Sequence, residues 1–181
     1  GSNSKNYGDG FTTMYGADHE DIAYSYRTGN HGDGSWYSIN GNIDYQRTSR
    51  KNKQRMITFS YKINTQPQTS NSNTGYEDIH AKEEVDDLVK RLLLKNSQSD
   101  GKTNTMEQTF QVDYTTPIGE LHTVEAGAKY IFRRNTSDNK LYEAAGGSDD
   151  YLYNEDRSSD YRHLNHILAA YLGYKLKYKD F

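Results

Sequence analysis

The chain has no cysteine, only two prolines and one tryptophan among its 181 residues. Without cysteine there is no disulfide framework, no thiol nucleophile and no cysteine-based zinc site. Long apolar runs are also missing, because the longest, residues 167–172, falls far short of the roughly 20 residues that a membrane-spanning helix needs. This excludes helical spans in this sequence. It leaves membrane-spanning β-strands open, since their signal is alternation over about ten residues.

Apolar residues make up 33% of the chain and its mean hydropathy is -1.08, so we expect no large dry core. The aromatic residues are unevenly chosen, with 17 tyrosines against five phenylalanines. Tyrosine suits surfaces that are apolar at one end and wet at the other, including membrane interfaces and binding faces. The net charge of -3, with both signs interspersed, gives no basic footprint for nucleic acid, and nucleic-acid binding is not expected.

Strict alternation of apolar and polar residues predicts a hairpin over residues 35–64, with a short basic connection at 48–54. A second hairpin of the same kind is predicted over 105–133, with a tight connection around Pro117 and Gly119. The longest alternation predicts a strand over 161–178. Each ribbon has one apolar and one polar face, because side chains alternate across a strand.

The remaining segments carry weaker signals. Residues 1–34 are interpreted as a polar N-terminal loop region with one short strand at 21–27 and a loop at 28–34, preceding a β-barrel segment at 35–181. Long polar loops are predicted over 65–105, including 65–75, and over 135–160. Within the first, residues 81–95 fit either a short amphipathic helix or an extended strand from Leu88, and the helix is slightly favoured. The fold class is therefore all-β, an antiparallel meander of five or six long strands.

Candidate metal sites are weak. The run Asp18-His19-Glu20-Asp21 lies near His31 in sequence but lacks ligand spacing, and we interpret it as a solvated loop. Residues 30–34 share letters with a calcium loop but lack its terminal glutamate. An acidic cluster is a further calcium candidate, also interpreted as solvated. It comprises Asp149, Asp150, Glu155 and Asp156.

No catalytic constellation emerges, so we expect neither an enzyme nor a cofactor. Carboxylates such as Asp44 and Asp113 have nothing that tunes one against the other, and no Gly-x-Ser-x-Gly elbow or phosphate-binding glycine loop occurs. In a barrel, four polar-face residues would wet the lumen: Asp44, Asp113, Glu125 and Lys129. Two histidines on the apolar face, His122 and His166, are interpreted as interfacial anchors.

A set of aromatic residues at strand ends is predicted to lie at a membrane interface, in preference to stacking on sugar rings. The set comprises Trp36, Tyr37, Tyr45, Tyr61, Tyr114, Tyr130, Tyr174 and Tyr178.

The phrases TFQVDYTTPI at 109–118 and VEAGAKYIFRR at 124–134 resemble outer-membrane β-barrel proteins of the Bacteroidota, the TonB-dependent-receptor-like barrels. The shorter phrases NIDY at 42–45 and TFSY at 58–61 are similar to other strands of that family. The resemblance implies a plug domain, a barrel of about 22 strands and nutrient uptake that uses TonB energy. Because this sequence contains no plug and too few strands, we expect it to be an excised barrel piece that self-associates through its unpaired edges.

Two hypotheses follow. The leading one is part of a TonB-dependent-receptor-like barrel in the outer membrane of a Gram-negative bacterium, non-catalytic, with membrane lipid, the rest of the barrel and TonB, through the plug, as partners. The alternative is a soluble β-sandwich that binds a ligand such as carbohydrate and packs its apolar faces on each other.

Overall fold

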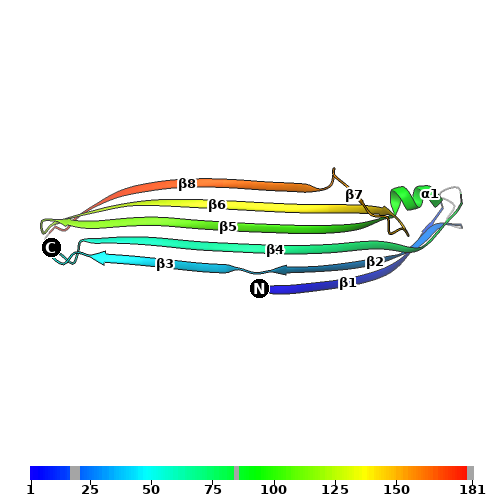
Figure 1. The fold of residues 1–181 in the computed structure, drawn as a ribbon, viewed down its shortest axis with the longest axis horizontal. Helices are drawn as coiled ribbons and strands as arrows, with labels where there is room; N and C mark the ends of the chain where they lie inside the picture. Colours follow the sequence, from blue (N-terminus) through cyan, green and yellow to red (C-terminus); the bar gives the residue numbers. More distant parts are fainter. Residues whose placement is uncertain (17–20, 84–85, 179–181) are drawn as a thin grey trace. The chain divides into compact units, whose positions relative to one another are not determined.

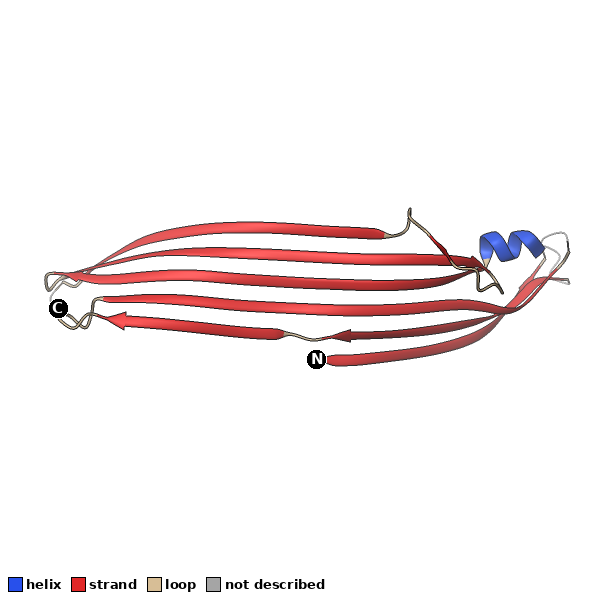
Figure 2. Cartoon of the chain, in the orientation of Figure 1, coloured by secondary structure: helices blue, strands red, loops and turns tan. Residues whose placement is uncertain are grey.

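The structure is a computed structural model that describes residues 1–16, 21–83 and 86–178, and most of them lie in β-strands (Figures 1 and 2). The strands are β1 (Ser2–Tyr15), β2 (Ile22–Trp36), β3 (Ile39–Thr48), β4 (Met56–Ala81), β5 (Lys95–Ile118), β6 (His122–Ala145), β7 (Leu152–Tyr153) and β8 (Ser159–Leu176). A short helix separates β4 from β5 and consists of α1 (Asp86–Leu88) and a π-helical turn, η1 (Val89–Leu93). No helix among the described residues is long and apolar enough to cross a membrane.

The strands form one antiparallel sheet in the order β1-β2-β4-β5-β6-β7, which confirms the all-β antiparallel fold class. Strand β4 pairs with β3 through residues 56–65 and with β2 through residues 68–81. Strand β8 pairs with β6, as does the two-residue β7. Among the described residues the sheet is open, with no bridge from its last strands back to its first.

Two compact units divide the chain. Unit 1 contains residues 1–37, 67–103 and 136–161, and unit 2 contains residues 38–66, 104–135 and 162–181. Unit 1 therefore holds β1, β2, the helical segment and β7, whereas unit 2 holds β3 and most of β8. Strands β4, β5 and β6 each contribute residues to both units.

The predicted hairpins are present. The strands of the first are β3 and the beginning of β4, joined by a turn over the predicted connection, and their register pairs Ile43 with Tyr61 and Tyr45 with Phe59. In the second, β5 ends at Ile118 and β6 begins at His122, after Gly119 adopts a φ of 69° that favours glycine. Strand β8 matches the long strand predicted over 161–178, and the helix is the correct choice within 81–95.

The predicted loops are largely wrong. Residues 2–15 form β1, residues 22–34, including the predicted loop at 28–34, lie inside β2, and residues 65–75 lie inside β4. Residues 95–105 already belong to β5, and residues 135–145 belong to β6, so only 146–158, which include β7, remain of the last predicted loop. The structure thus has eight strands where five or six were expected.

These extra strands form because main-chain pairing does not require apolar side chains. Their asparagine, serine and threonine side chains also hydrogen-bond across the ladder: Ser35 to Thr69 at 2.8 Å and Thr74 to Asn30 at 2.9 Å. A further bond runs from the Asn71 amide to Asp33 at 3.1 Å. Polar side chains on both faces remove the alternation from which a strand is predicted, while leaving the ladder intact.

Buried apolar residues are few. Those below a tenth of their full exposure are Val89, Leu94 and Ala144, all in unit 1 around the helical segment. No residue of the described apolar face of unit 2 reaches that burial, and the described strands form a single sheet with no second sheet packed on it. The packed apolar faces of the sandwich alternative are therefore not seen in the described part of the chain.

Candidate functional site

Unit 2 presents an apolar face to its surroundings. Alternate residues of β3, β4, β5, β6 and β8 point to it, as the register and the ring contacts between strands show. Its large side chains are exposed: Ile43 by 70%, Leu168 by 78% and Leu172 by 79%. So much contiguous apolar exposure marks a membrane or protein interaction surface.

Two tyrosine–histidine pairs join β6 to β8 on this face. The Tyr130 hydroxyl lies 2.7 Å from Nδ1 of His166, and the Tyr174 hydroxyl lies 2.5 Å from Nδ1 of His122. On each strand the two paired residues are eight positions apart. The face between them is wholly apolar, with Val124, Ala126 and Ala128 on β6 and Leu168, Ala170 and Leu172 on β8.

The spacing of the pairs matches the dimensions of a lipid layer. Eight residues of strand extend about 26 Å at about 3.3 Å per residue. At the usual barrel tilt this is about 20 Å along the membrane normal, against an apolar band of about 25 Å in outer-membrane barrels. The spacing of the two pairs is therefore close to the separation of the aromatic girdles in outer-membrane barrels.

An aromatic row crosses the same face. The rings of Tyr61 and Phe110 are 4.8 Å apart, those of Phe110 and Tyr130 are 6.2 Å apart, and Tyr130 continues to His166 at 6.1 Å. The same rings help to line a shallow groove of about 400 Å³, whose walls also include Ile43, Phe59, Val112 and Leu168. An open groove lined by apolar and aromatic side chains suits hydrocarbon chains.

The polar face of unit 2 carries cross-strand ion pairs. Arg133 donates to Glu107 at 2.5 Å and Lys175 donates to Glu125 at 2.6 Å. A hollow of about 640 Å³ lies on this face. Its lining includes Asn42, Asp44, Ser60, Lys62, Thr109 and Gln111. The face carries amides, hydroxyls and charges of both signs, so it can be hydrated and neither sign of charge dominates.

A glycine on β6 positions one contact of the polar face. The Tyr171 ring from β8 lies over Gly127, and its hydroxyl donates to Asp113 of β5 at 2.5 Å. A Cβ on Gly127 would meet the tyrosine ring and would come within 2.6 Å of Asp113 Oδ1. The absence of a side chain at Gly127 thus lets Tyr171 bridge three strands.

The predicted site residues separate as follows. Tyr45, Tyr61, Tyr114, Tyr130 and Tyr174 share the apolar face, whereas Trp36 and Tyr37 lie at the end of β2 and Tyr178 follows β8. The four predicted lumen residues share the polar face, where Asp44 accepts from Asn42 at 3.1 Å. Their roles at an interface and in a lumen stay predictions.

The partners of these residues were not predicted from the sequence. Alternation puts His122 and His166 on the apolar face, and the equal eight-residue spacing of His122 from Tyr130 and of His166 from Tyr174 is the one local signal of the tyrosine–histidine pairs. The contact of Tyr171 with Gly127 had no signal, because it depends on the register between strands.

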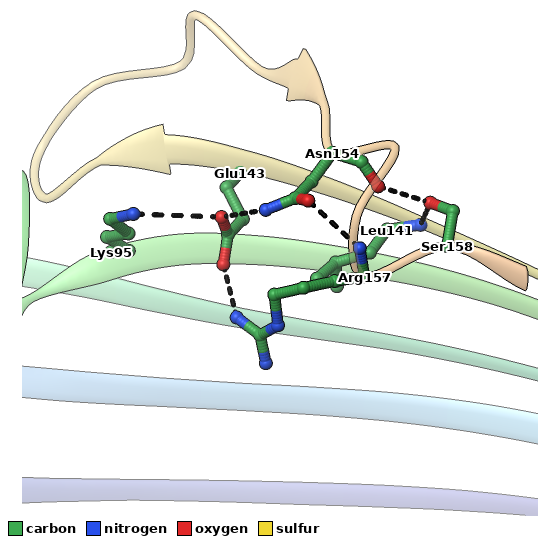
Figure 3. A network of polar contacts seen from close by, with 6 residues as sticks. All are labelled: Lys95, Leu141, Glu143, Asn154, Arg157 and Ser158. Atoms are coloured by element: carbon green, nitrogen blue, oxygen red, sulfur yellow. Dashed lines mark hydrogen bonds and ion pairs between the residues drawn. The ribbon is translucent and has the colours of Figure 1, made fainter.

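In unit 1, Glu143 holds the segment after β6 against the sheet (Figure 3). Asn154 donates to its Oε2 at 2.7 Å, Arg157 donates to Oε1 at 2.5 Å, and Lys95 lies 3.8 Å away. Ser158 accepts from the Leu141 amide and donates to the Asn154 carbonyl. The Asn154 hydrogen bond, supported by the charges of Lys95 and Arg157, holds the pKa of Glu143 below its ordinary value.

The candidate metal sites gain no support. Residues 17–20 lie outside the described part of the chain, and Asp21 is paired with Lys82 at 3.0 Å. Residues 30–34 lie in β2, not in a loop. Within residues 1–16, 21–83 and 86–178, no three histidine, aspartate or glutamate side chains are close enough together to hold a metal ion.

Comparison with models of protein families gives a match over most of the chain. The sequence profile of an outer membrane protein beta-barrel family matches residues 48–181. A search of curated proteins finds no significant match.

We expect Gly127→Ala to lower the free energy of unfolding by about 1–3 kcal/mol, the usual cost of overpacking, because the added methyl group displaces Tyr171. Urea titrations in detergent, followed by circular dichroism, measure this. Gly10→Ala is the matched control, since a Cβ there meets nothing within 4 Å, and it should change the stability by less than about 0.5 kcal/mol. Equal effects of the two substitutions would contradict the packing role of Gly127.

We expect Glu143→Gln to speed hydrogen exchange of the Leu141 amide about fivefold at neutral pH, equivalent to about 1 kcal/mol, because charge-assisted contacts to partly exposed partners are lost. Glu155→Gln, on the exposed turn, is the control and should leave the exchange rate of the Leu141 amide unchanged. Because the pKa of Glu143 is lowered in the folded protein, its contribution is complete above the ordinary value of 4.5 and is lost as the pH falls through the lowered pKa. The difference between wild type and Glu143→Gln should therefore vanish in acid, and a difference that persists there would contradict the assignment.

Proposed function

Because the chain belongs to the outer membrane protein beta-barrel family, we propose that it forms part of the wall of a TonB-dependent-receptor-like barrel for nutrient uptake. It is an outer-membrane protein of a Gram-negative bacterium. The proposal extends this to uptake of a nutrient in a member of the Bacteroidota, with TonB acting through a plug domain. The role is one of passage and docking, without catalysis.

The observation that carries the proposal is the exposed apolar face of unit 2, bounded on β6 and β8 by the two tyrosine–histidine pairs. In water such a face would be costly, at roughly 25 cal/mol for each Å² of apolar surface. In a bilayer the same side chains meet hydrocarbon, and the tyrosine hydroxyls and imidazoles meet the interfaces. The strand segments between the pairs are close to the 9–11 residues that a tilted transmembrane strand requires.

The polar face supports passage of a polar solute. Asp44, Asp113, Glu125 and Lys129 would line the wet interior, together with the amide and hydroxyl groups of neighbouring strands. Glu107 and Glu125 are neutralised by Arg133 and Lys175, so the wall offers hydrogen bonds without a strong charge barrier. We infer that the nutrient is polar, and that unit 1, whose strands are rich in asparagine, serine and threonine, lies outside the hydrocarbon.

The two edges of unit 2 require partners in this setting. Strand β3 pairs only with β4, and β8 pairs only with β6, among the described strands. Unpaired main-chain groups are not tolerated in hydrocarbon, so a membrane-spanning sheet must be closed. We propose that further strands of the barrel occupy both edges, and that the isolated chain self-associates through them.

The proposal predicts that the two faces of β8 differ in their access to lipid. In a Trp36→Phe background, Leu168→Trp should be strongly quenched by brominated acyl chains in vesicles, because position 168 is on the apolar face. Ala169→Trp, one residue further on the opposite face, should be quenched little. Tryptophan fluorescence with and without brominated lipid measures both variants.

Equal quenching at 168 and 169 would contradict the lipid-facing assignment. If the chain is a folded monomer in buffer without detergent and does not associate with vesicles, the alternative of a soluble binding module is favoured instead.

A further inference from the structure

Charge is distributed unequally between the two units. Unit 1 contains 19 aspartate and glutamate residues against nine lysine and arginine residues, whereas unit 2 contains six against 13. The near-neutral chain therefore combines an acidic unit with a basic one. The excess positive charge of unit 2 needs a counterpart.

Much of this excess lies in one turn. Residues 47–55, at the junction of β3 and β4, include five basic residues, all exposed: Arg47, Arg50, Lys51, Lys53 and Arg55. We call this segment the basic turn. No aspartate or glutamate occurs between Tyr45 and Tyr76. The other short turn, between β5 and β6, carries only one charge, that of Glu120.

The cations of the basic turn have no carboxylate partners among the described residues. None of the five lies within 4.0 Å of a described carboxylate, and Arg55 instead donates to Thr116 at 3.1 Å. In unit 1, by contrast, most basic residues are paired, as Arg27, Lys90 and Arg157 are with Asp9, Asp86 and Glu143. The basic turn thus presents charge that the described fold does not neutralise.

The turn is held in one conformation by its own hydrogen bonds. The Ser49 amide donates to the Arg55 carbonyl at 2.9 Å, and the Arg55 amide donates to the Asn52 carbonyl at 3.0 Å. The Gln54 amide donates to the Asn52 side chain at 2.9 Å. An ordered turn displays its cations without the cost of ordering a flexible loop on binding.

The apolar face continues directly into this turn. Tyr45 pairs with Phe59, and two residues further along the ladder Arg47 pairs with Ile57, where the basic turn begins. Tyr45 is 57% exposed and Phe59 is 46% exposed. A surface that is apolar, then aromatic, then basic along one strand matches the order of acyl chain, glycerol region and phosphate in a lipid leaflet, and long basic side chains can extend to the headgroups.

We propose that the basic turn binds the phosphate groups of anionic phospholipids in the leaflet at the short-turn rim of the barrel. The inference rests on the proposed membrane insertion, because only insertion brings the turn to headgroup level. Continuity with the apolar face favours lipid phosphate over free phosphate, which would need no such continuity. Each lysine or arginine near an anionic surface strengthens binding about fivefold.

The test compares association of the chain with vesicles of phosphatidylcholine alone and of phosphatidylcholine mixed with phosphatidylglycerol, measured by flotation. Wild type should prefer the anionic vesicles, and Lys51→Gln/Lys53→Gln should reduce that preference on the order of 25-fold. Lys5→Gln/Lys102→Gln changes the net charge equally but lies in unit 1, and it should keep the wild-type preference. Sodium chloride at about 1 M should weaken the preference of the wild type, because the Debye length falls to about 3 Å.

The outcomes separate the two proposals. The lipid-phosphate site alone is overturned if the wild type inserts into both kinds of vesicle without preference. It is also overturned if the two double variants lose the preference for anionic vesicles equally. Absence of association with either kind of vesicle overturns the proposed membrane insertion, and the site with it. If the wild type binds inorganic phosphate in solution but shows no preference for the vesicles that contain phosphatidylglycerol, the ligand is free phosphate and the lipid assignment is wrong.

Discussion

Main-chain hydrogen bonding between antiparallel neighbours is the constraint on which the rest of this structure depends. The described chain has almost no buried apolar core, so cross-strand pairing, not side-chain packing, defines the fold of each unit. In hydrocarbon this pairing is obligatory, because no water is present to satisfy the peptide groups. Because main-chain pairing does not depend on the polarity of the side chains, the polar strands of unit 1 extend as regularly as the apolar strands of unit 2.

Given this scaffold, the side chains decide what each face contacts. In unit 2 one face carries exposed leucine, isoleucine and aromatic groups, and the other carries matched charges and amides. The tyrosine–histidine pairs combine both properties, since each presents ring surface to its apolar neighbours and a hydrogen bond between its polar atoms. A single sheet can therefore separate a lipid environment from an aqueous one without an interior of its own.

Electrostatics acts differently in the two units. In unit 1 most cations are neutralised locally, and Glu143 shows how such pairing fastens a loop segment to a strand. In unit 2 the polar-face carboxylates Glu107 and Glu125 are paired with Arg133 and Lys175, whereas the cations of the basic turn have no carboxylate partner among the described residues. Paired charges at a surface add little stability, but they keep the wall neutral, whereas unpaired charges at a rim are available to an outside partner.

The sequence by itself determined the all-β class, both hairpins, the long last strand and the composition of the two faces of unit 2, because alternation with period two is a local signal. The family resemblance of the second hairpin was likewise visible in its residues. Strands rich in asparagine, serine and threonine, such as β1 and the second half of β4, escaped prediction because both of their faces are polar. Only the tertiary structure decided the register between neighbouring strands. The register in turn determines the tyrosine–histidine pairs, the packing of Tyr171 over Gly127 and the hydrogen-bond partners of Glu143. These contacts join residues far apart in the chain, and their distances depend on how strands align, which no local pattern encodes.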